Sequence, residues 1–159
     1  MELVILLAMN GLFWGLIVAL IALGLSIIFG LLDIINVAHG DFFMVGSVLA
    51  WTMIQYVDNF WLAFLIVPFV GLLLGMFVER IVMRPIENSA SLSIVAAFGL
   101  SLIIQESVRA TFGATPKRIL DPIGFSIPFF DTSYEVYRFF AAFISVIAIS
   151  VFFLFLHKT

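Results

Sequence analysis

Five polar or helix-breaking residues lie close together between two apolar runs, each long enough to cross or nearly cross a bilayer. They are Asp33, Asn36, His39, Gly40 and Asp41. Polar groups at membrane depth are costly, so such a group indicates a purpose. Three interpretations stay open: metal or acid–base chemistry, capping of the two helices, and a helix break that faces a cavity, as in transporters.

Metal or acid–base chemistry is the weakest of the three, because His39 has no second histidine nearby. We therefore predict no catalytic residue, no metal site and no cofactor. For capping, Gly30 would end the first helix and Gly40-Asp41 would start the next. The Asp41 carboxylate would then accept hydrogen bonds from the free N–H groups of the first turn. Capping is compatible with a functional break.

Composition places this chain in a membrane. Of its 159 residues, 64% are hydrophobic and 11% are charged, whereas a soluble domain has about 25% charged residues. The apolar residues form blocks, which indicates an integral membrane protein in contact with the lipid bilayer. The absence of cysteine excludes disulfides and thiolate chemistry, and the scattered Lys and Arg give no support for nucleic-acid binding.

The apolar blocks predict an all-α fold, a polytopic helical bundle with about five membrane segments. Their ranges are 3–29, 42–57, 60–78, 90–110 and 139–156. The second is short, so it is either a thin or tilted span or a re-entrant helix. Proline and glycine make 111–138 an external loop, and Arg84-Pro85 lies in a sharp cytoplasmic connection, 80–89. Lys and Arg counts favour an external N-terminus only weakly.

The N-terminal segment is expected to stay in the mature protein. No Lys or Arg precedes Arg80, and residue 2 is an acidic Glu2. A cleavable signal peptide needs a basic start and a small-residue cleavage site.

Small residues recur at helical spacing in the first and third segments: Gly11, Gly15 and Ala19, then Gly71 and Gly75. Such faces let helices approach closely in lipid, although they can also leave room for a substrate path. In the fourth segment, a stripe recurs every four residues: Ser93, Ala97, Ser101, Gln105 and Arg109. Ser101 and Gln105 would either hydrogen-bond neighbouring helices or line a polar passage. Glu106 and Arg109 are spaced to form an ion pair.

Gly30 to Gly46 contains Asn36-Val37-Ala38-His39-Gly40-Asp41-Phe42. This segment resembles the Asn-x-Ala-His-Gly-Asp/Glu-Phe segment of branched-chain amino acid ABC transporter permeases of the LivH type. Further blocks match in the same order: Ala19 to Leu25, Glu79-Arg80 with Arg84-Pro85, and Phe98 to Glu106. The resemblance covers nearly the whole chain. Because such permeases are longer, the chain resembles their N-terminal half and is expected to stop before the ATPase-coupling loop.

The resemblance implies a permease subunit of an ATP-driven importer for branched-chain amino acids, working by alternating access in the prokaryotic inner membrane. It implies a second homologous permease subunit, two cytoplasmic ATPase subunits and an extracytoplasmic amino-acid-binding protein as partners. The subunit itself would not be an enzyme. A urea or short-amide permease of the same superfamily, a membrane-embedded enzyme and a small structural membrane subunit remain as alternatives.

Overall fold

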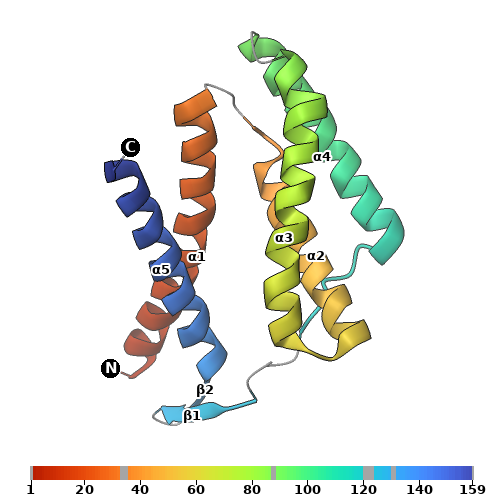
Figure 1. The fold of residues 1–159 in the computed structure, drawn as a ribbon. Coiled ribbons are helices and arrows are strands. Elements are labelled where there is room, and N and C mark those ends of the chain that lie inside the picture. The colour runs from red at the N-terminus through yellow and green to blue at the C-terminus, as the bar shows by residue number, and fades with distance from the viewer. Residues whose placement is uncertain (1, 33–35, 87–88, 120–123, 130–131, 159) are drawn as a thin grey trace. The chain divides into compact units, whose positions relative to one another are not determined.

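The computed structural model describes residues 2–32, 36–86, 89–119, 124–129 and 132–158. Helices account for 85% of the chain, which confirms the all-α expectation. The five long helices are α1 (Glu2–Leu32), α2 (His39–Val57), α3 (Phe60–Val78), α4 (Ala90–Phe112) and α5 (Val136–Lys158). A π-helix, η1 (Glu79–Met83), and a 3-10 turn, η2 (Arg84–Ile86), follow α3. Two short strands, β1 (Ser126–Phe129) and β2 (Thr132–Glu135), precede α5 (Figure 1).

Each predicted segment is a helix, but several ends differ from the prediction. Gly30 does not close the first helix, because α1 continues to Leu32. A glycine inside a helix costs only about 1 kcal/mol relative to alanine, and the apolar residues that follow outweigh it. The predicted loop at 80–89 is also wrong for most of its length, since helical structure continues to Ile86.

Four stretches within the described residues are long and apolar enough to cross a membrane. They are Leu3–Gly30, Phe60–Ile86, Ala90–Phe112 and Val136–Leu154. The 19-residue helix α2 is not among them. It carries polar side chains at both ends, His39 and Asp41 at its start and Gln55 near its close, and this lowers its hydropathy. The two alternatives for this segment, a thin or tilted span and a re-entrant helix, therefore both remain.

The chain forms two compact units. The first comprises Met1–Gly24 and Leu120–Thr159. In it, β1 and β2 pair antiparallel with Ser126 opposite Glu135 and Phe129 opposite Thr132, and α5 follows β2 without a linker. Tyr134 of β2 is only 5% exposed and packs its ring against Phe13 and Phe139. The hairpin was not predicted from the sequence, which indicated only an external loop here.

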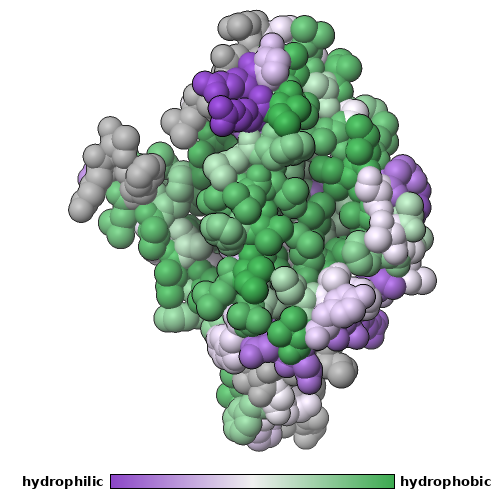
Figure 2. All heavy atoms as spheres, turned by 45° about the vertical axis from the view of Figure 1, so that its right-hand side comes forward, coloured by the Kyte–Doolittle hydropathy of each residue, from purple (hydrophilic) through white to green (hydrophobic). Residues whose placement is uncertain are grey.

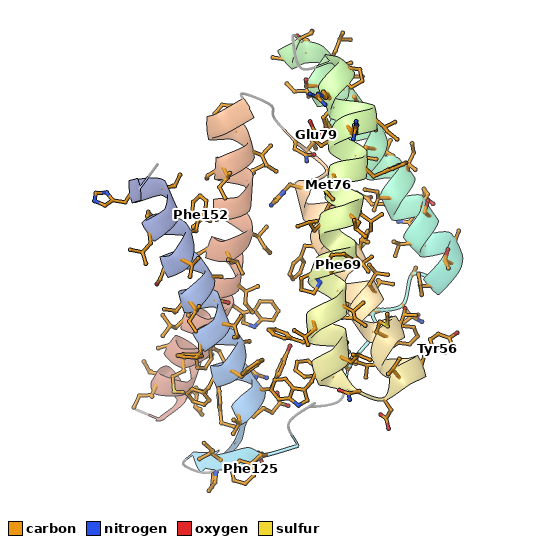
Figure 3. All side chains as sticks on the ribbon, in the orientation of Figure 1. Tyr56, Phe69, Met76, Glu79, Phe125 and Phe152 are labelled. Atoms are coloured by element: carbon orange, nitrogen blue, oxygen red, sulfur yellow. The ribbon has the colours of Figure 1, made fainter. Side chains whose placement is uncertain are left out.

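The second unit comprises Leu25–Ile119 and contains α2, α3, η1, η2 and α4. Its core is the buried pair Met83 and Ala97, against which Val78, Val82 and Leu100 pack. Asn59 caps α3 by accepting a hydrogen bond from the Leu62 N–H, and Ser89 caps α4 in the same way from the Leu92 N–H. Glu79 directly follows α3, and the outward-pointing Tyr56, which is 86% exposed, lies at the end of α2 (Figure 3).

Hydrophobic side chains cover most of the helix sides, while hydrophilic ones gather towards helix ends (Figure 2). Many large apolar residues are more than a third exposed, among them Trp14, Leu72 and Phe143. A surface of this kind suits a solvent of lipid tails or neighbouring helices rather than water.

Candidate functional site

Residues 36–38, directly before α2, form a turn. Asn36 organises it: its Oδ1 accepts from the Ala38 N–H at 3.1 Å, and its backbone carbonyl accepts from the His39 N–H at 3.2 Å. Ala38 is fully buried, and α2 begins directly after it at His39. Asp33 lies outside the described residues.

Asp41 is not the N-cap of α2, so that prediction is wrong. The N-cap is Ala38, which makes no side-chain cap hydrogen bond, and Asp41 stands in the first helical turn. Helical bonding already starts at Ala38, whose backbone carbonyl accepts from the N–H groups of Asp41 and Phe42. A carboxylate in the first turn still interacts favourably with the helix dipole.

The Asp41 carboxylate instead reaches α4. Gln105 Nε2 donates to Asp41 Oδ1 at 3.0 Å and to Ser101 Oγ at 3.0 Å. Ser101 is buried, and the other two side chains are half-buried. These three residues, called the Gln105 network below, join the start of α2 to α4. Gln105 therefore bonds between helices, while Ser101 accepts from Gln105 within α4.

The rest of the stripe on α4 meets other elements in turn. The Ser93 hydroxyl lies 3.3 Å from the carbonyl of Ile86 in η2 and 3.0 Å from the carbonyl of Ser89. Ala97, one turn later, packs against Met83 of η1. Arg109, at the far end, pairs with Glu106 at 2.8 Å on the exposed surface, which confirms the predicted ion pair.

A cavity of about 320 Å³ lies within the second unit, beside the start of α2. Its lining combines the helix break with α3 and η1: Ile28, Asn36, His39, Phe42, Gly71, Gly75, Val78, Glu79, Met83 and Arg84. Gly75 and Gly71 stand four and eight residues before Glu79. At 1.5 Å per residue, the cavity therefore extends about 12 Å from the charged end of α3 into its apolar part.

Glu79 and Arg84 bring opposite charges to this cavity. Neither has an ion-pair partner among the described residues. The ion pairs there are Glu106–Arg109 and Glu135–Arg138. The same part of the chain holds no group of His, Asp and Glu that could bind a metal ion. The cavity thus combines an acidic group, a basic group, two polar side chains from the break and apolar walls.

The structure brings together some of the predicted site residues and separates others. Asn36, His39, Gly71 and Gly75 line the cavity, whereas Asp41, Ser101 and Gln105 form the network behind it, and Gly40 is in neither group. Sequence reasoning missed Glu79 and Arg84 as site residues. Their charges at the end of an apolar helix were the available signal.

The small-residue faces have no packing partner within the described residues. A Cβ added at Gly11, Gly15, Gly71 or Gly75 would meet no atom within 4 Å, and Ala19 is exposed. Close packing at Gly11, Gly15 and Ala19 stays a prediction that needs a neighbouring subunit. At Gly71 and Gly75 the space beside the backbone is part of the cavity, as a small-residue face that leaves room for a substrate path requires.

Comparison with known proteins identifies the family. Residues 7–159 match the branched-chain amino acid transport system / permease component family. The chain belongs to this permease family. It is 34% identical over 116 residues to the high-affinity branched-chain amino acid transport system permease protein LivH of Salmonella typhimurium (strain LT2) and of Escherichia coli (strain K12). Each of these matches covers 66% of this chain and 37% of the relative.

The permease protein BraD of Pseudomonas aeruginosa is 31% identical over 120 residues, which are 69% of this chain and 39% of BraD. The chain thus spans less than two-fifths of the length of these curated relatives. No solved structure matches it. Family membership and the four apolar helices make the chain a multi-pass membrane component of a transport system rather than an enzyme.

Proposed function

We propose that the chain is a transmembrane permease subunit of an ATP-binding-cassette importer for branched-chain amino acids, and that the cavity beside α2 is part of its substrate path. The observation that carries this proposal is the composition of the cavity. A zwitterionic amino acid with a branched apolar side chain needs one acidic group, one basic group and an apolar wall close together. Glu79, Arg84 and the side chains of Phe42 and Met83 supply this combination.

Size and chemistry support the same assignment. Pockets for small molecules range from about 300 to 1,000 Å³, and this cavity of about 320 Å³ lies at the lower end. The substrate ammonium would face Glu79 and its carboxylate would face Arg84, while Asn36 and His39 offer further hydrogen-bonding groups. The absence of side chains at Gly71 and Gly75 provides the space for a branched aliphatic group.

Transport would proceed by alternating access between two arrangements of these helices, whose populations the ATPases bias. ATP hydrolysis would reside in two separate cytoplasmic subunits. A second homologous permease and an extracytoplasmic amino-acid-binding protein would complete the complex in the prokaryotic inner membrane. These partners follow from the kind of system in which permeases of this family work.

Two other functions are less well supported. A urea or short-amide permease would have no use for the apolar wall of Phe42, Val78 and Met83, because its substrate has no apolar side chain. A structural membrane subunit would need neither a helix break nor, at one cavity, two opposite charges that form no ion pair among the described residues. Leaving such charges near lipid without a role is costly.

Uptake of leucine and of urea into proteoliposomes tests the proposal, with the permease assembled with its ATPases, second permease and binding protein. Gly75→Leu fills the cavity and is expected to abolish ATP-dependent leucine uptake. Leu72→Phe adds bulk to an exposed position of the same helix and is the matched control, expected to keep uptake within about twofold because Leu72 is not among the residues that line the cavity. Uptake of urea without leucine, or full leucine uptake by Gly75→Leu, would contradict the proposal.

The charges can be tested separately. Glu79→Gln and Arg84→Gln each remove one partner of the zwitterion, so we expect each to raise the leucine concentration for half-maximal uptake by about tenfold or more. Glu106→Gln alters an exposed carboxylate away from the cavity and is expected to leave that concentration unchanged.

A further inference from the structure

We propose that Gln105 is a positioning residue that holds the first turn of α2, and with it the wall of the cavity, through the carboxylate of Asp41. The inference rests on the proposed function for its transport measurement only. Its structural basis is the Gln105 network, in which one carboxamide donates to Asp41 on α2 and to Ser101 on its own helix.

The chemistry of the three side chains fixes the orientation of the carboxamide. The Gln105 amide nitrogen has two N–H groups, and the network uses both. Turning the carboxamide around would place its oxygen against the Asp41 carboxylate, where two acceptors repel each other. The Asp41 carboxylate, which can only accept, therefore fixes the orientation of the amide, and Ser101 accepts from its second N–H. The bond to the carboxylate is charge-assisted and is stronger than a neutral one.

Asp41 is well placed to transmit this restraint to the cavity. Successive residues of a helix point about 100° apart, so His39 and Phe42 project from faces of α2 different from that of Asp41. Asp41 points to α4, while its neighbours His39 and Phe42 line the cavity. Because α2 starts directly after the Asn36 turn, its first turn needs a restraint from another helix, and Gln105 provides one.

Substitutions of either partner test the hydrogen bond between Gln105 and Asp41. Gln105→Glu places two carboxylates about 3 Å apart, where like charges repel and the hydrogen bond between the amide and the carboxylate is lost. We expect an increase of about tenfold or more in the apparent KM for leucine uptake, with the maximal rate changed much less. Asp41→Asn keeps a hydrogen-bonding pair of amides and should change KM by about twofold or less.

The double variant Asp41→Asn/Gln105→Glu restores one amide and one carboxylate with their positions exchanged. We expect its KM to return to within about threefold of the unaltered protein. Gln55→Glu, the same substitution on the exposed end of α2, is the matched control and should change nothing. If Gln105→Glu does not insert into the membrane, the double variant decides: recovered insertion and KM support the pairing, and no recovery overturns it.

A second measurement does not depend on transport. The chain has no native cysteine, so a Phe42→Cys reporter is the one labelling site in this chain, and its labelling is read on the band of this chain after the subunits are separated. In the assembled permease without substrate, we expect Gln105→Glu to change the labelling rate by a water-soluble thiol reagent at least about threefold, and the exchanged pair to restore it. An unchanged rate and KM in Gln105→Glu would overturn the inference. If labelling changes as expected but leucine is not transported, the proposed function fails and the positioning role stands.

Discussion

Replacing Asn10 with leucine should destabilise the first unit, because one side-chain oxygen serves two partners there. Asn10 Oδ1 accepts from the Tyr134 hydroxyl at 2.6 Å and from Arg138 Nη1 at 2.7 Å. Tyr134 is almost fully buried, so Asn10→Leu removes a hydrogen bond from a residue that water cannot easily reach. Both partners come from a part of the chain more than 120 residues away in sequence.

The expected magnitude follows from the two bonds. A neutral hydrogen bond contributes about 1 kcal/mol, and one to a charged group about 1.5–3 kcal/mol. The second value must be reduced, because the Arg138 side chain is 42% exposed and also interacts with Glu135 and with the Tyr134 ring. Hydrogen bonds between membrane helices average only about 0.6 kcal/mol. We therefore expect Asn10→Leu to lower the free energy of unfolding by about 1–2 kcal/mol.

Unfolding by SDS in mixed micelles, followed by circular dichroism, measures this change. Asn10→Leu should unfold at a lower SDS fraction, whereas Asn10→Asp keeps the acceptor and should not. Tyr134→Phe should cost about 1 kcal/mol and add little to Asn10→Leu, because both remove the same bond. Equal unfolding of Asn10→Leu and the unaltered chain, or full additivity in the double variant, would refute the reasoning.

Three further predictions concern other elements. A cysteine at Ser126 should react only with a reagent applied outside the cell and one at Ala90 only from the cytoplasm; the reverse pattern would contradict the predicted orientation. Gly15→Leu should weaken assembly with the second permease in pull-down assays far more than Leu16→Ile, while the isolated chain unfolds unchanged because the space beside Gly15 is open. Asn59→Ala removes the cap of α3 and should cost about 1 kcal/mol in the same SDS titration, whereas Asn59→Asp should be nearly neutral.

The helices were predictable because membrane helices are encoded in contiguous apolar blocks. Phe60–Val78 was predicted with both ends correct, since polar residues flank it on each side. The start of α2 was less predictable. Asp41 and Asn36 are both good capping residues, and only the fold decides which one meets the backbone. Once Asn36 bonds to the Ala38 N–H, Asp41 is available to α4.

The hairpin and the cavity depend on contacts between distant parts of the chain. The strands are four residues each and β1 contains Pro128, so the local pattern gave no strand signal. What holds them is Tyr134 against α1, a contact with no trace in the sequence around it. The cavity likewise combines side chains from the end of α1, the start of α2 and the end of α3. Their charges could be noticed individually, but their proximity could not be derived.

This chain has polar side chains that are hydrogen-bonded between elements and charged side chains that line the cavity, and the two kinds differ in what they contribute. Asn10 and Gln105 carry polar side chains into apolar helices, and each is bonded to groups of another element. Such groups lower the cost of burial and give the helices a defined register. Glu79 and Arg84 line one cavity and form no ion pair within the described residues, although a five-residue spacing brings them to the same helix end. Under the proposed function, the two opposite charges at the cavity are there for a ligand, and a zwitterion would satisfy both at once. The apolar side chains of Phe42, Val78 and Met83 in the same lining would then suit a zwitterion with an aliphatic side chain.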